Sequence, residues 1–263
     1  MSAPDVITAD SLSRRFGGLV AVEGYSLALR QGELVGLIGP NGAGKTTAFN
    51  LLTGIIRPTS GRIRIAGEDL TGRAPNALAR RGVARTFQNI RLFSDLSVLE
   101  NIMCGAHMRH GASFVSTLLQ LPAFRRAEGV IGQRAMEIAE LTGLAHMAAR
   151  RAGDLSYGDQ RRVEIARALA SEPAALLLDE PAAGLNPSET EALVALIRGV
   201  NRQLGIAVMV VEHDMRLVMG LCQRIQVLNR GRLVADGTPT EVQNDPGVIE
   251  AYLGTRRSGG ANA

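Results

Sequence analysis

Residues 33–52 of the chain read ELVGLIGPNGAGKTTAFNLL. The apolar run 33–38 is typical of a buried strand, and the mostly apolar residues 48–52 fit a helix that Gly54 would end. A loop with three glycines lies between them. This order of strand, glycine-rich loop and helix indicates the first unit of an α/β fold with a largely parallel sheet.

The loop has the spacing of a phosphate-binding loop. Gly39 and Gly44 enclose four residues and are followed by Lys45 and Thr46. Glycines let backbone N–H groups turn toward phosphates, the lysine bridges the β- and γ-phosphates, and the hydroxyl binds Mg²⁺. The alternative, a glycine turn beside a stray lysine, does not explain why the only lysine of the chain stands here. The nucleotide is therefore expected to bind to Gly39, Pro40, Asn41, Gly42, Ala43, Gly44, Lys45, Thr46 and Thr47.

A second apolar run ends in two carboxylates. Residues 174–178 are expected to form a buried strand, and Asp179 and Glu180 follow it. Ligands of α/β proteins bind where such strands end, so these carboxylates should face the phosphate loop. Asp179 suits the Mg²⁺ shell, through water, and Glu180 suits orientation or deprotonation of the attacking water. Without a phosphate loop, the same residues would indicate only a solvated acidic loop.

His213 follows a third expected strand, 206–211. An imidazole at a strand end can donate a hydrogen bond to a γ-phosphate and so respond to its presence. A purely structural histidine is the alternative.

Residues 155–160, LSYGDQ, open another expected helix, with Ser156 as its cap. The N-terminus of such a helix attracts anions. Because Lys45 already holds the phosphates of its own nucleotide, the second helix tip is expected to act on the nucleotide of a neighbouring molecule. This arrangement predicts a dimer, completed by Ser156, Tyr157, Gly158, Asp159 and Gln160.

The rest of the chain supports the same fold class. The sequence predicts an antiparallel sheet in 6–29, a strand at 62–66, helices from about 75 to 144, a helix capped by Ser188, a hairpin about 229–231 and a short helix that ends near Leu253. We expect a P-loop NTPase core with a mostly parallel sheet, an N-terminal antiparallel β-subdomain and an inserted α-helical subdomain. The expected domain is 1–253, with the core in 1–88 and 160–253, the helical subdomain in 89–159 and a flexible tail in 254–263.

The composition is that of a soluble globular protein. The chain has 263 residues, 46% of them hydrophobic, and a net charge of +4. No run reaches the roughly 18 apolar residues of a membrane-spanning helix, and no secretory signal is recognisable. Cys104 and Cys222 lie far apart and outside any Cys-x-x-Cys motif, so reduced thiols are expected. The sequence predicts a cytosolic protein that meets a membrane through a partner.

Six motifs in order make the chain resemble the ATP-binding subunits of ABC transporters from about residue 6 to 253. They are Phe16, residues 39–47, Gln88, residues 155–160, residues 176–181 and His213. The resemblance implies that Phe16, flanked by Val22, stacks on adenine, although Phe16 could also be a plain core residue. It implies that Gln88 contacts Mg²⁺ and the attacking water.

The resemblance also implies that two head-to-tail subunits enclose two ATP molecules. Ser156 and Gly158 would close over the γ-phosphate held by the partner's Lys45. We call residues 156–160 the signature segment. Tyr157 and Asp159 depart from the family's Ser-Gly-Gly-Gln pattern and place a carboxylate near bound phosphate, so the side-chain contacts expected there differ, and Gln160 would take over part of the role. Asn186 stands where many relatives have Asp.

Finer features are similar to one branch, the larger ATPase of branched-chain amino acid importers. They are FGGLVAV at 16–22, ARTFQNIRLF at 84–93, Tyr157 in the signature segment and AYLG at 251–254. The similarity implies four things: a second ATPase subunit, transmembrane permease subunits, an extracytoplasmic substrate-binding protein and a place on the cytoplasmic face of the inner membrane. ATPases for urea, other amino acids or lipopolysaccharide export look much alike, so the cargo stays open.

Two expectations concern arginines. Segment 88–93 should grip a cytoplasmic helix of the permease. Arg85 and Arg91 either pair with that helix or stay solvated. Pairs such as Arg161-Arg162 would serve a rival function, a soluble ABC ATPase that acts on nucleic acid or ribosomes. Such proteins carry two ATPase halves or long coiled coils, and aromatic residues for base stacking are few here, so we expect no nucleic-acid partner.

Overall fold

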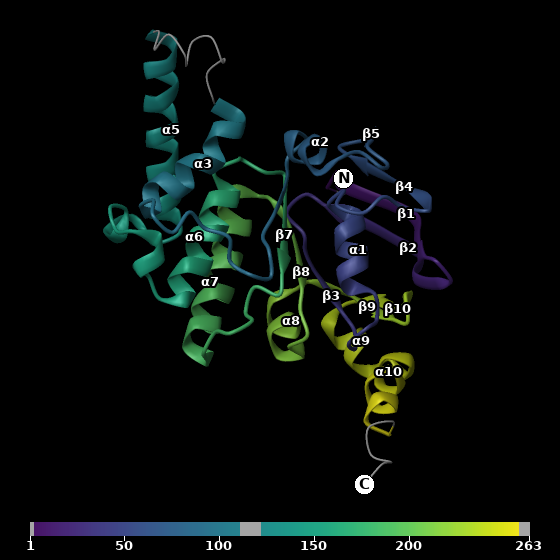
Figure 1. Cartoon of the computed structure of the whole chain (residues 1–263). Coiled ribbons are helices and arrows are strands. Elements are labelled where there is room, and N and C mark those ends of the chain that lie inside the picture. The colour runs from purple at the N-terminus through teal and green to yellow at the C-terminus, as the bar shows by residue number, and fades with distance from the viewer. Residues whose placement is uncertain (1–2, 111–121, 258–263) are drawn as a thin grey trace.

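A computed structural model describes residues 3–110 and 122–257 of the chain (Figure 1). Its centre is a six-stranded sheet with the order β10-β9-β3-β8-β7-β6. Neighbouring strands are parallel except for the β9–β10 hairpin at one edge. The strands are β3 (Leu34–Ile38), β6 (Val83–Arg85), β7 (Ala175–Asp179), β8 (Ala207–Val211), β9 (Arg224–Asn229) and β10 (Arg232–Gly237).

A four-stranded antiparallel sheet with the order β2-β1-β4-β5 covers one side of this core. It comprises β1 (Asp5–Phe16), β2 (Leu19–Arg30), β4 (Ser60–Ile65) and β5 (Glu68–Asp69). The helix after the phosphate loop, α1 (Lys45–Leu52), shares one apolar cluster with this sheet. The predicted β-subdomain and the predicted fold class are confirmed.

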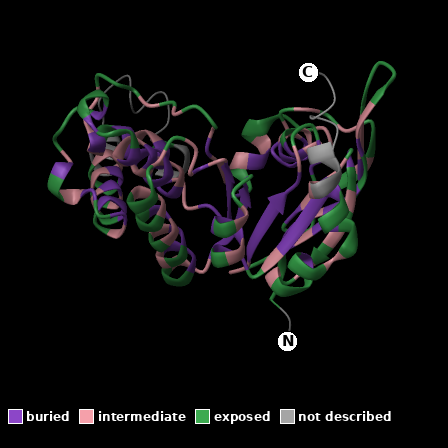
Figure 2. Ribbon diagram, turned by 90° about the horizontal axis from the view of Figure 1, so that it is seen from below, coloured by how far each residue is buried: buried purple, intermediate pink, exposed green. Residues whose placement is uncertain are grey.

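Side chains along the central strands alternate between two apolar clusters. Leu176 and Leu178 belong to the cluster on the helical side, whereas Leu177 belongs to the cluster shared with α1 and the antiparallel sheet. A strand with helices or a second sheet on both faces must be apolar at every position. This double coverage explains the unbroken apolar runs in the sequence, and Figure 2 shows the buried strands between exposed outer surfaces.

Helices on the other side of the sheet form the second cluster. They are α6 (Tyr157–Leu169), α7 (Pro187–Leu204), α8 (Met215–Leu221), α9 (Pro239–Asn244) and α10 (Pro246–Arg257), and α2 (Pro75–Arg80) precedes β6. Two further helices, α3 (Val98–His110) and α5 (Pro122–Leu141), extend away from the sheet (Figure 1). Short 3-10 turns at Ala145–Met147 and Ala152–Asp154 lead back to α6. This helical excursion lies in the predicted subdomain, and its division at 89 and 159 stays a prediction.

The expectation of helices from about 75 to 144 does not hold at β6. Gly82, with φ +87°, ends α2, and the three residues of β6 then pair in parallel with β7. Three residues are too few for a period of two to show in the sequence. This edge strand matters because Gln88 follows it directly.

The predicted cap of α7 is also wrong, because Asn186 caps the helix instead of Ser188. The Asn186 side chain accepts a hydrogen bond from the backbone N–H of Glu189 at 3.0 Å, and the Glu189 carboxylate accepts one from the backbone N–H of Asn186 at 3.0 Å. Pro187 then occupies the first helical position, where its missing N–H costs nothing. The hydroxyl of Ser188 donates to the Asn186 side chain.

The last helix is longer than predicted. It runs through Arg257 and does not end near Leu253, so the tail expected from residue 254 is helical in its first residues. The part of that tail from 258 to 263 lies outside the described residues.

Candidate functional site

The phosphate loop connects β3 to α1, as the sequence predicts. Gly39, Gly42 and Gly44 all have positive φ angles, a conformation that glycine adopts without steric cost. A Cβ atom on Gly39 would lie 2.1 Å from the Leu228 carbonyl oxygen, so no other residue fits there. The glycine spacing is therefore required by the backbone path of the loop.

Lys45 points back into its own loop. Its Nζ donates hydrogen bonds to the carbonyl oxygens of Gly39 at 2.7 Å and Pro40 at 3.1 Å. Burial lowers the pKa of Lys45, and the charge of Glu180 acts in the opposite direction. The ammonium is thus held at the mouth of the loop, within the electrostatic field of the Glu180 carboxylate.

A cavity of about 600 Å³ opens in front of the loop. Phe16, at the end of β1, lines it with 43% of its surface exposed, as a platform for a planar base requires. Val22 is fully buried in the core behind Gly44 and does not line the cavity. The full lining is Phe16, Leu19, Val20, Ala21, Asn41, Gly42, Ala43, Gly44, Lys45, Thr46, Thr47, Glu180, Arg230 and Gly231.

Leu19 and Arg230 in this lining were not predicted. Both stand in or beside tight turns, and neither type of residue signals nucleotide binding by itself. Their places follow from the pairing of β1 with β2 and of β9 with β10, which only the tertiary structure reveals.

Three segments bring polar side chains together beside the loop. Glu180 follows β7 with φ +44°, and its backbone N–H donates to the Val211 carbonyl at 2.9 Å. The Gln88 side-chain amide donates to the Glu180 carboxylate at 2.9 Å, although the two residues are 92 positions apart. His213 Nδ1 lies 3.9 Å from the same carboxylate. Glu180 is the centre of this group, because Gln88 and His213 both approach the same oxygen of its carboxylate.

His213 sits on a loop that Glu212 organises. The buried carboxylate of Glu212 accepts hydrogen bonds from the backbone N–H groups of Ala182 at 2.9 Å and His213 at 3.2 Å. Burial raises the pKa of Glu212, and these hydrogen bonds act in the opposite direction. The imidazole itself is 61% exposed. Sequence reasoning overlooked Glu212, which reads as the end of an apolar strand.

Asp179 is the buried last residue of β7, with Arg85 as its cationic neighbour. Arg85 Nη2 lies 3.8 Å from the Asp179 carboxylate, and Nη1 donates to the Thr53 hydroxyl at 2.9 Å. Burial raises the pKa of Asp179, and Arg85 counteracts that rise. The guanidinium also lies over the Phe87 ring, 4.6 Å from its centroid. The expectation of a solvated Arg85 is therefore wrong, because this side chain is only 14% exposed, whereas its pairing with a permease helix stays a prediction.

Arg161 anchors the segment that carries Gln88. It is fully buried in α6 and donates to the carbonyl oxygens of Phe87 and Gln88, each at 2.7 Å, and to the Glu164 carboxylate at 2.8 Å. The Arg161 side chain is therefore not available to bind nucleic-acid phosphates. Its spacing of three from Glu164 is the signal that could have indicated an internal ion pair.

The signature segment begins α6 in the predicted way. The Ser156 side chain accepts a hydrogen bond from the backbone N–H of Asp159 and donates one to its carboxylate at 2.9 Å. Asp159 also pairs with Arg162 at 3.1 Å, so its charge is partly neutralised within the helix. No residue of 156–160 lines the nucleotide cavity of the same chain. Intramolecular contacts thus use Asp159, the unexpected residue, to hold Ser156 in place.

The sole lysine supplies a direct test of the cavity. A small amine reagent such as acetic anhydride should modify only Lys45 and the α-amino group, and ATP at about ten times its Kd should slow labelling of Lys45 about tenfold. The lowered pKa of Lys45 favours reaction, whereas its burial slows it. Mass spectrometry of labelled peptides measures both rates. The α-amino group is the internal control, and equal labelling of Lys45 with and without ATP would place the phosphates elsewhere.

The geometry agrees with known proteins. Residues 22–183 match the family model described as ABC transporter, and residues 232–257 match the model described as branched-chain amino acid ATP-binding cassette transporter. The high-affinity branched-chain amino acid transport ATP-binding protein LivG of Salmonella typhimurium is 49% identical over 97% of this chain and 99% of its own length.

Solved structures give the same result. The ADP conformation of an ATP-binding cassette of an ABC transporter matches with a TM-score of 0.83 and 30% identity, over 96% of this chain and all of that one. A dimeric ATP-binding cassette in a post-hydrolysis state, bound to ADP and phosphate, matches with a TM-score of 0.73 and 25% identity, over 89% of this chain and 98% of that one. In the described parts of this chain, no helix is both long and apolar enough to cross a bilayer. The chain belongs to the ABC transporter family, as one of its ATP-binding subunits.

Proposed function

We propose that this subunit binds and hydrolyses ATP, as one half of a dimer, to drive uptake of branched-chain amino acids through a membrane permease. One observation carries the hydrolytic part: Glu180 lines the cavity of the phosphate loop, and Gln88 and His213 both approach its carboxylate. Phosphoryl transfer to water requires positioning and charge neutralisation more than covalent chemistry. These three side chains suit that task.

Glu180 is the residue that activates water in this proposal. The amide nitrogen of Gln88 holds one carboxylate oxygen at 2.9 Å, which fixes the direction from which water is polarised. His213 is close enough to Glu180 to sense its charge and exposed enough to reach a γ-phosphate. Adenine would stack on Phe16, and the loop from Gly39 to Thr47 would cradle the phosphates.

The residues present also fit Mg²⁺. Thr46 lines the cavity and carries a hydroxyl, and the amide oxygen of Gln88 remains for a metal because the hydrogen bond to Glu180 uses the nitrogen. Asp179 would act through water, since its carboxylate is buried next to Arg85. These oxygen donors are the ligands that hard cations prefer. When bound, Mg²⁺ would neutralise charge on the β- and γ-phosphates.

The lining of the cavity supports a dimer. Its lining contains the phosphate loop and Glu180 but no residue of the signature segment, whose helix N-terminus is suited to an anion. A second subunit in head-to-tail orientation would bring its Ser156 and Gly158 over the γ-phosphate. Ser156 would then exchange its hydrogen bond to Asp159 for one to the phosphate. The dimeric relative with bound ADP and phosphate supports this arrangement.

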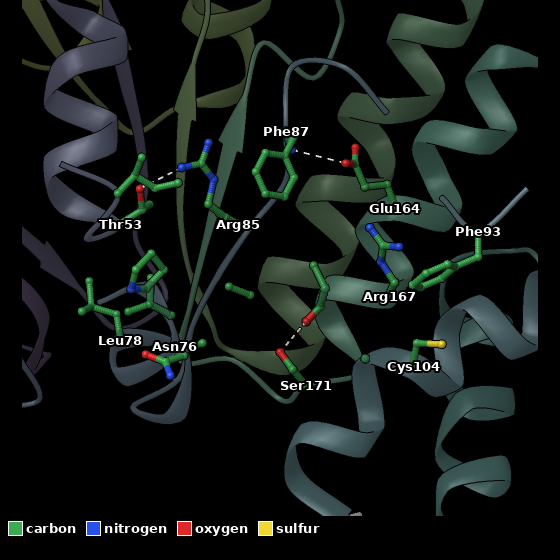
Figure 3. A pocket seen from close by; sticks show the side chains of 17 residues that line it. Thr53, Asn76, Leu78, Arg85, Phe87, Phe93, Cys104, Glu164, Arg167 and Ser171 are labelled. Carbon is green, nitrogen blue, oxygen red and sulfur yellow. Dashed lines mark hydrogen bonds between the residues drawn. The ribbon is translucent and has the colours of Figure 1, made fainter. Parts of the chain in front are cut away.

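A groove between the core and the helical subdomain offers a place for the permease (Figure 3). It measures about 570 Å³ and runs from Leu78 and Asn76 on the α2 side to Phe93 and Cys104 on the α3 side. Phe93 is 54% exposed, and the Arg167 guanidinium lies over its ring at 5.9 Å from the centroid. An apolar groove of this kind suits an amphipathic helix. We assign it to a cytoplasmic helix of the permease.

The groove and the catalytic site share one segment of chain. Phe87 lines the groove, and its neighbour Gln88 contacts Glu180. The backbone N–H of Phe87 donates to Glu164 at 3.3 Å, so α6 carries both the groove wall and the signature segment. A helix that moves in the groove would therefore change the position of Gln88 at the site of hydrolysis.

The cargo is assigned from the relatives. A branched-chain amino acid fits both the LivG relative and the family model that matches 232–257. Urea, other amino acids and lipopolysaccharide are the alternatives, because the residues described above would contact nucleotide and permease, and none of them is proposed to contact cargo. The extracytoplasmic binding protein and the cytoplasmic face of the inner membrane belong to the same proposal.

The function can be tested on the complex with the permease subunits. Branched-chain amino acids with their binding protein should stimulate ATP hydrolysis, and the permease should protect Cys104 from a maleimide. Cys104 is half-buried in the groove, whereas Cys222 is buried and its burial raises the pKa of the thiol to about 12, so Cys222 is the unreactive control. Stimulation of ATP hydrolysis by urea or another compound would assign that compound as the cargo in place of branched-chain amino acids. Equal labelling of Cys104 in the free chain and in the complex would show that the permease does not bind in the groove.

A further inference from the structure

The turn between β9 and β10 places an arginine in the lining of the nucleotide cavity. Asn229 pairs with Arg232 across the hairpin, so Arg230 and Gly231 are the two central residues of the turn. Their φ angles are +47° and +80°. Positive φ at both central positions is typical of a type I′ turn, in which Asn-Gly, Asp-Gly and Gly-Gly are strongly preferred. Arginine is therefore an unusual residue at position 230.

The backbone at position 230 is strained. At a positive φ the Cβ atom of an L-residue crowds its own backbone, whereas glycine has no Cβ atom and asparagine tolerates the conformation better. Among the non-glycine residues of 3–110 and 122–257, Glu180 and Arg230 are the two with positive φ that line the nucleotide cavity. Strained residues of this kind cluster at functional sites. The strain at position 230 indicates that the arginine side chain has a use in the cavity.

The turn is fixed against both the phosphate loop and β2. The backbone N–H of Gly231 donates to the Ala43 carbonyl at 2.8 Å, and the Gly231 carbonyl accepts a hydrogen bond from the backbone N–H of Glu23 at 2.8 Å. Contacts between β10 and β2 hold the hairpin beside the antiparallel sheet (Figure 1). The backbone of Arg230 is thereby held beside the cavity.

The turn stands between the two ends of the cavity. On one side it meets β2, where a Cβ atom on Gly231 would lie 2.8 Å from the Ala21 carbonyl oxygen. On the other side it meets Gly44, the residue before α1, whose Cβ atom would lie 3.4 Å from the Gly231 Cα atom. Adenine on Phe16 and the β- and γ-phosphates in the loop would leave the ribose and the α-phosphate between them. Arg230 is therefore placed beside the middle of the nucleotide.

The guanidinium of Arg230 is available for a ligand. Other arginines of the hairpin are paired, Arg224 with Asp236 at 3.0 Å and Arg232 with Glu23 at 2.9 Å. Within residues 3–110 and 122–257, the exposed Arg230 side chain forms neither an ion pair nor a hydrogen bond. The planar fork of a guanidinium matches the oxygens of a phosphate.

Charge also favours a phosphate at this place. The ionised side chains of the lining are Lys45, Glu180 and Arg230. Without Arg230 the charges of the other two would cancel, whereas with it two cations face one carboxylate. A cleft with an excess of positive charge attracts an anionic ligand. The positive charge of the cavity therefore depends on Arg230.

We propose that Arg230 binds the nucleotide: its guanidinium pairs with the α-phosphate oxygens of the ATP or ADP that the phosphate loop holds. The inference rests on the proposed nucleotide site and adds one binding residue to it. This contact offsets the steric cost of arginine in the turn. Because ATP and ADP share the α-phosphate, which lies away from the bond that is cleaved, Arg230 contributes to affinity and not to the chemical step.

Arg230→Asn is the sharpest test, because asparagine suits the turn and has no charge. The Kd for ADP and the Kd for a non-hydrolysable ATP analogue should both rise about three- to tenfold, as expected for a partly exposed charge-assisted hydrogen bond. The KM for ATP should rise with them, and kcat should be nearly unchanged. The unfolding temperature of the nucleotide-free chain should rise by about one to three degrees, because the strain in the turn is relieved. Calorimetric titration, steady-state kinetics and thermal unfolding measure these quantities.

Arg232→Gln is the matched control. It removes the same charge two positions along the hairpin, where the arginine pairs with Glu23 and does not line the cavity. Its Kd values should equal those of the original chain at the same salt concentration. Arg230→Lys keeps the charge and loses the planar fork, so its Kd values should lie between those of the original chain and of Arg230→Asn.

Three results would overturn the proposal. Unchanged Kd values for Arg230→Asn, or an equal change in Arg232→Gln, would show that the Arg230 guanidinium does not contact the nucleotide. A much larger loss of affinity for the ATP analogue than for ADP would place the guanidinium at the γ-phosphate. Weaker binding together with a lower unfolding temperature would show that the substitution acts by damaging the turn.

The experiment separates this inference from the function on which it rests. An original chain that binds neither ADP nor the ATP analogue in the same titration would contradict the proposed function itself. An original chain that binds both, beside an Arg230→Asn chain that binds them equally well, would contradict only the role of Arg230.

Discussion

Glu180→Gln is expected to lower the rate of ATP hydrolysis by about two orders of magnitude or more while ATP still binds, because removal of a general base typically costs this much. Glutamine has the shape of glutamate and accepts a hydrogen bond from Gln88 through its amide oxygen, so the packing around position 180 is preserved. The amide cannot take a proton from water. ATP bound without hydrolysis should therefore accumulate in a closed dimer.

Single-turnover hydrolysis and size-exclusion chromatography with ATP measure the two effects. Glu191→Gln, which removes an exposed carboxylate on α7, is the matched control and should hydrolyse ATP at the original rate. Rapid turnover by Glu180→Gln would show that another group activates water. A monomeric Glu180→Gln chain in saturating ATP would contradict the dimer, and so would full activity of a chain that is prevented from associating.

His213→Ala should lower kcat about a hundredfold and change the affinity for ATP much less. Loss of one preorganised donor to a developing charge has this magnitude. His213 Nδ1 is 3.9 Å from the Glu180 carboxylate, and its loop is held by the buried Glu212, so the imidazole is placed before nucleotide arrives. Removal of the ring therefore affects the transition state more than the bound ground state.

Steady-state kinetics with an independent measurement of ATP binding separates kcat from affinity. His146→Ala is the control, because His146 is an exposed histidine in the helical subdomain, far along the chain from the phosphate loop. An unchanged kcat in His213→Ala would assign His213 a structural role only. A loss of ATP binding equal to the loss of rate would indicate that the loop had collapsed.

Local interactions explain which elements could be predicted. Three predicted features depend on residues within a few positions of one another. They are the loop from Gly39 to Thr47, the strand that ends at Asp179 and the cap of α6 by Ser156. The errors have local causes too. β6 is too short to show a period, and at the start of α7 Asn186 and Ser188 are both suitable caps, between which Pro187 at the first helical position decides.

The amino-acid sequence by itself determined the P-loop fold and the residues proposed to surround the phosphates, because glycine spacing, apolar runs and helix caps act over short stretches of chain. Only the tertiary structure decided which distant groups meet: Gln88 on Glu180, Arg85 on Asp179 and Arg161 on the Phe87 carbonyl. The physical reason is that each of these contacts depends on the order and pairing of strands and on helix packing, and no periodicity along the chain encodes a side chain's neighbour across the fold.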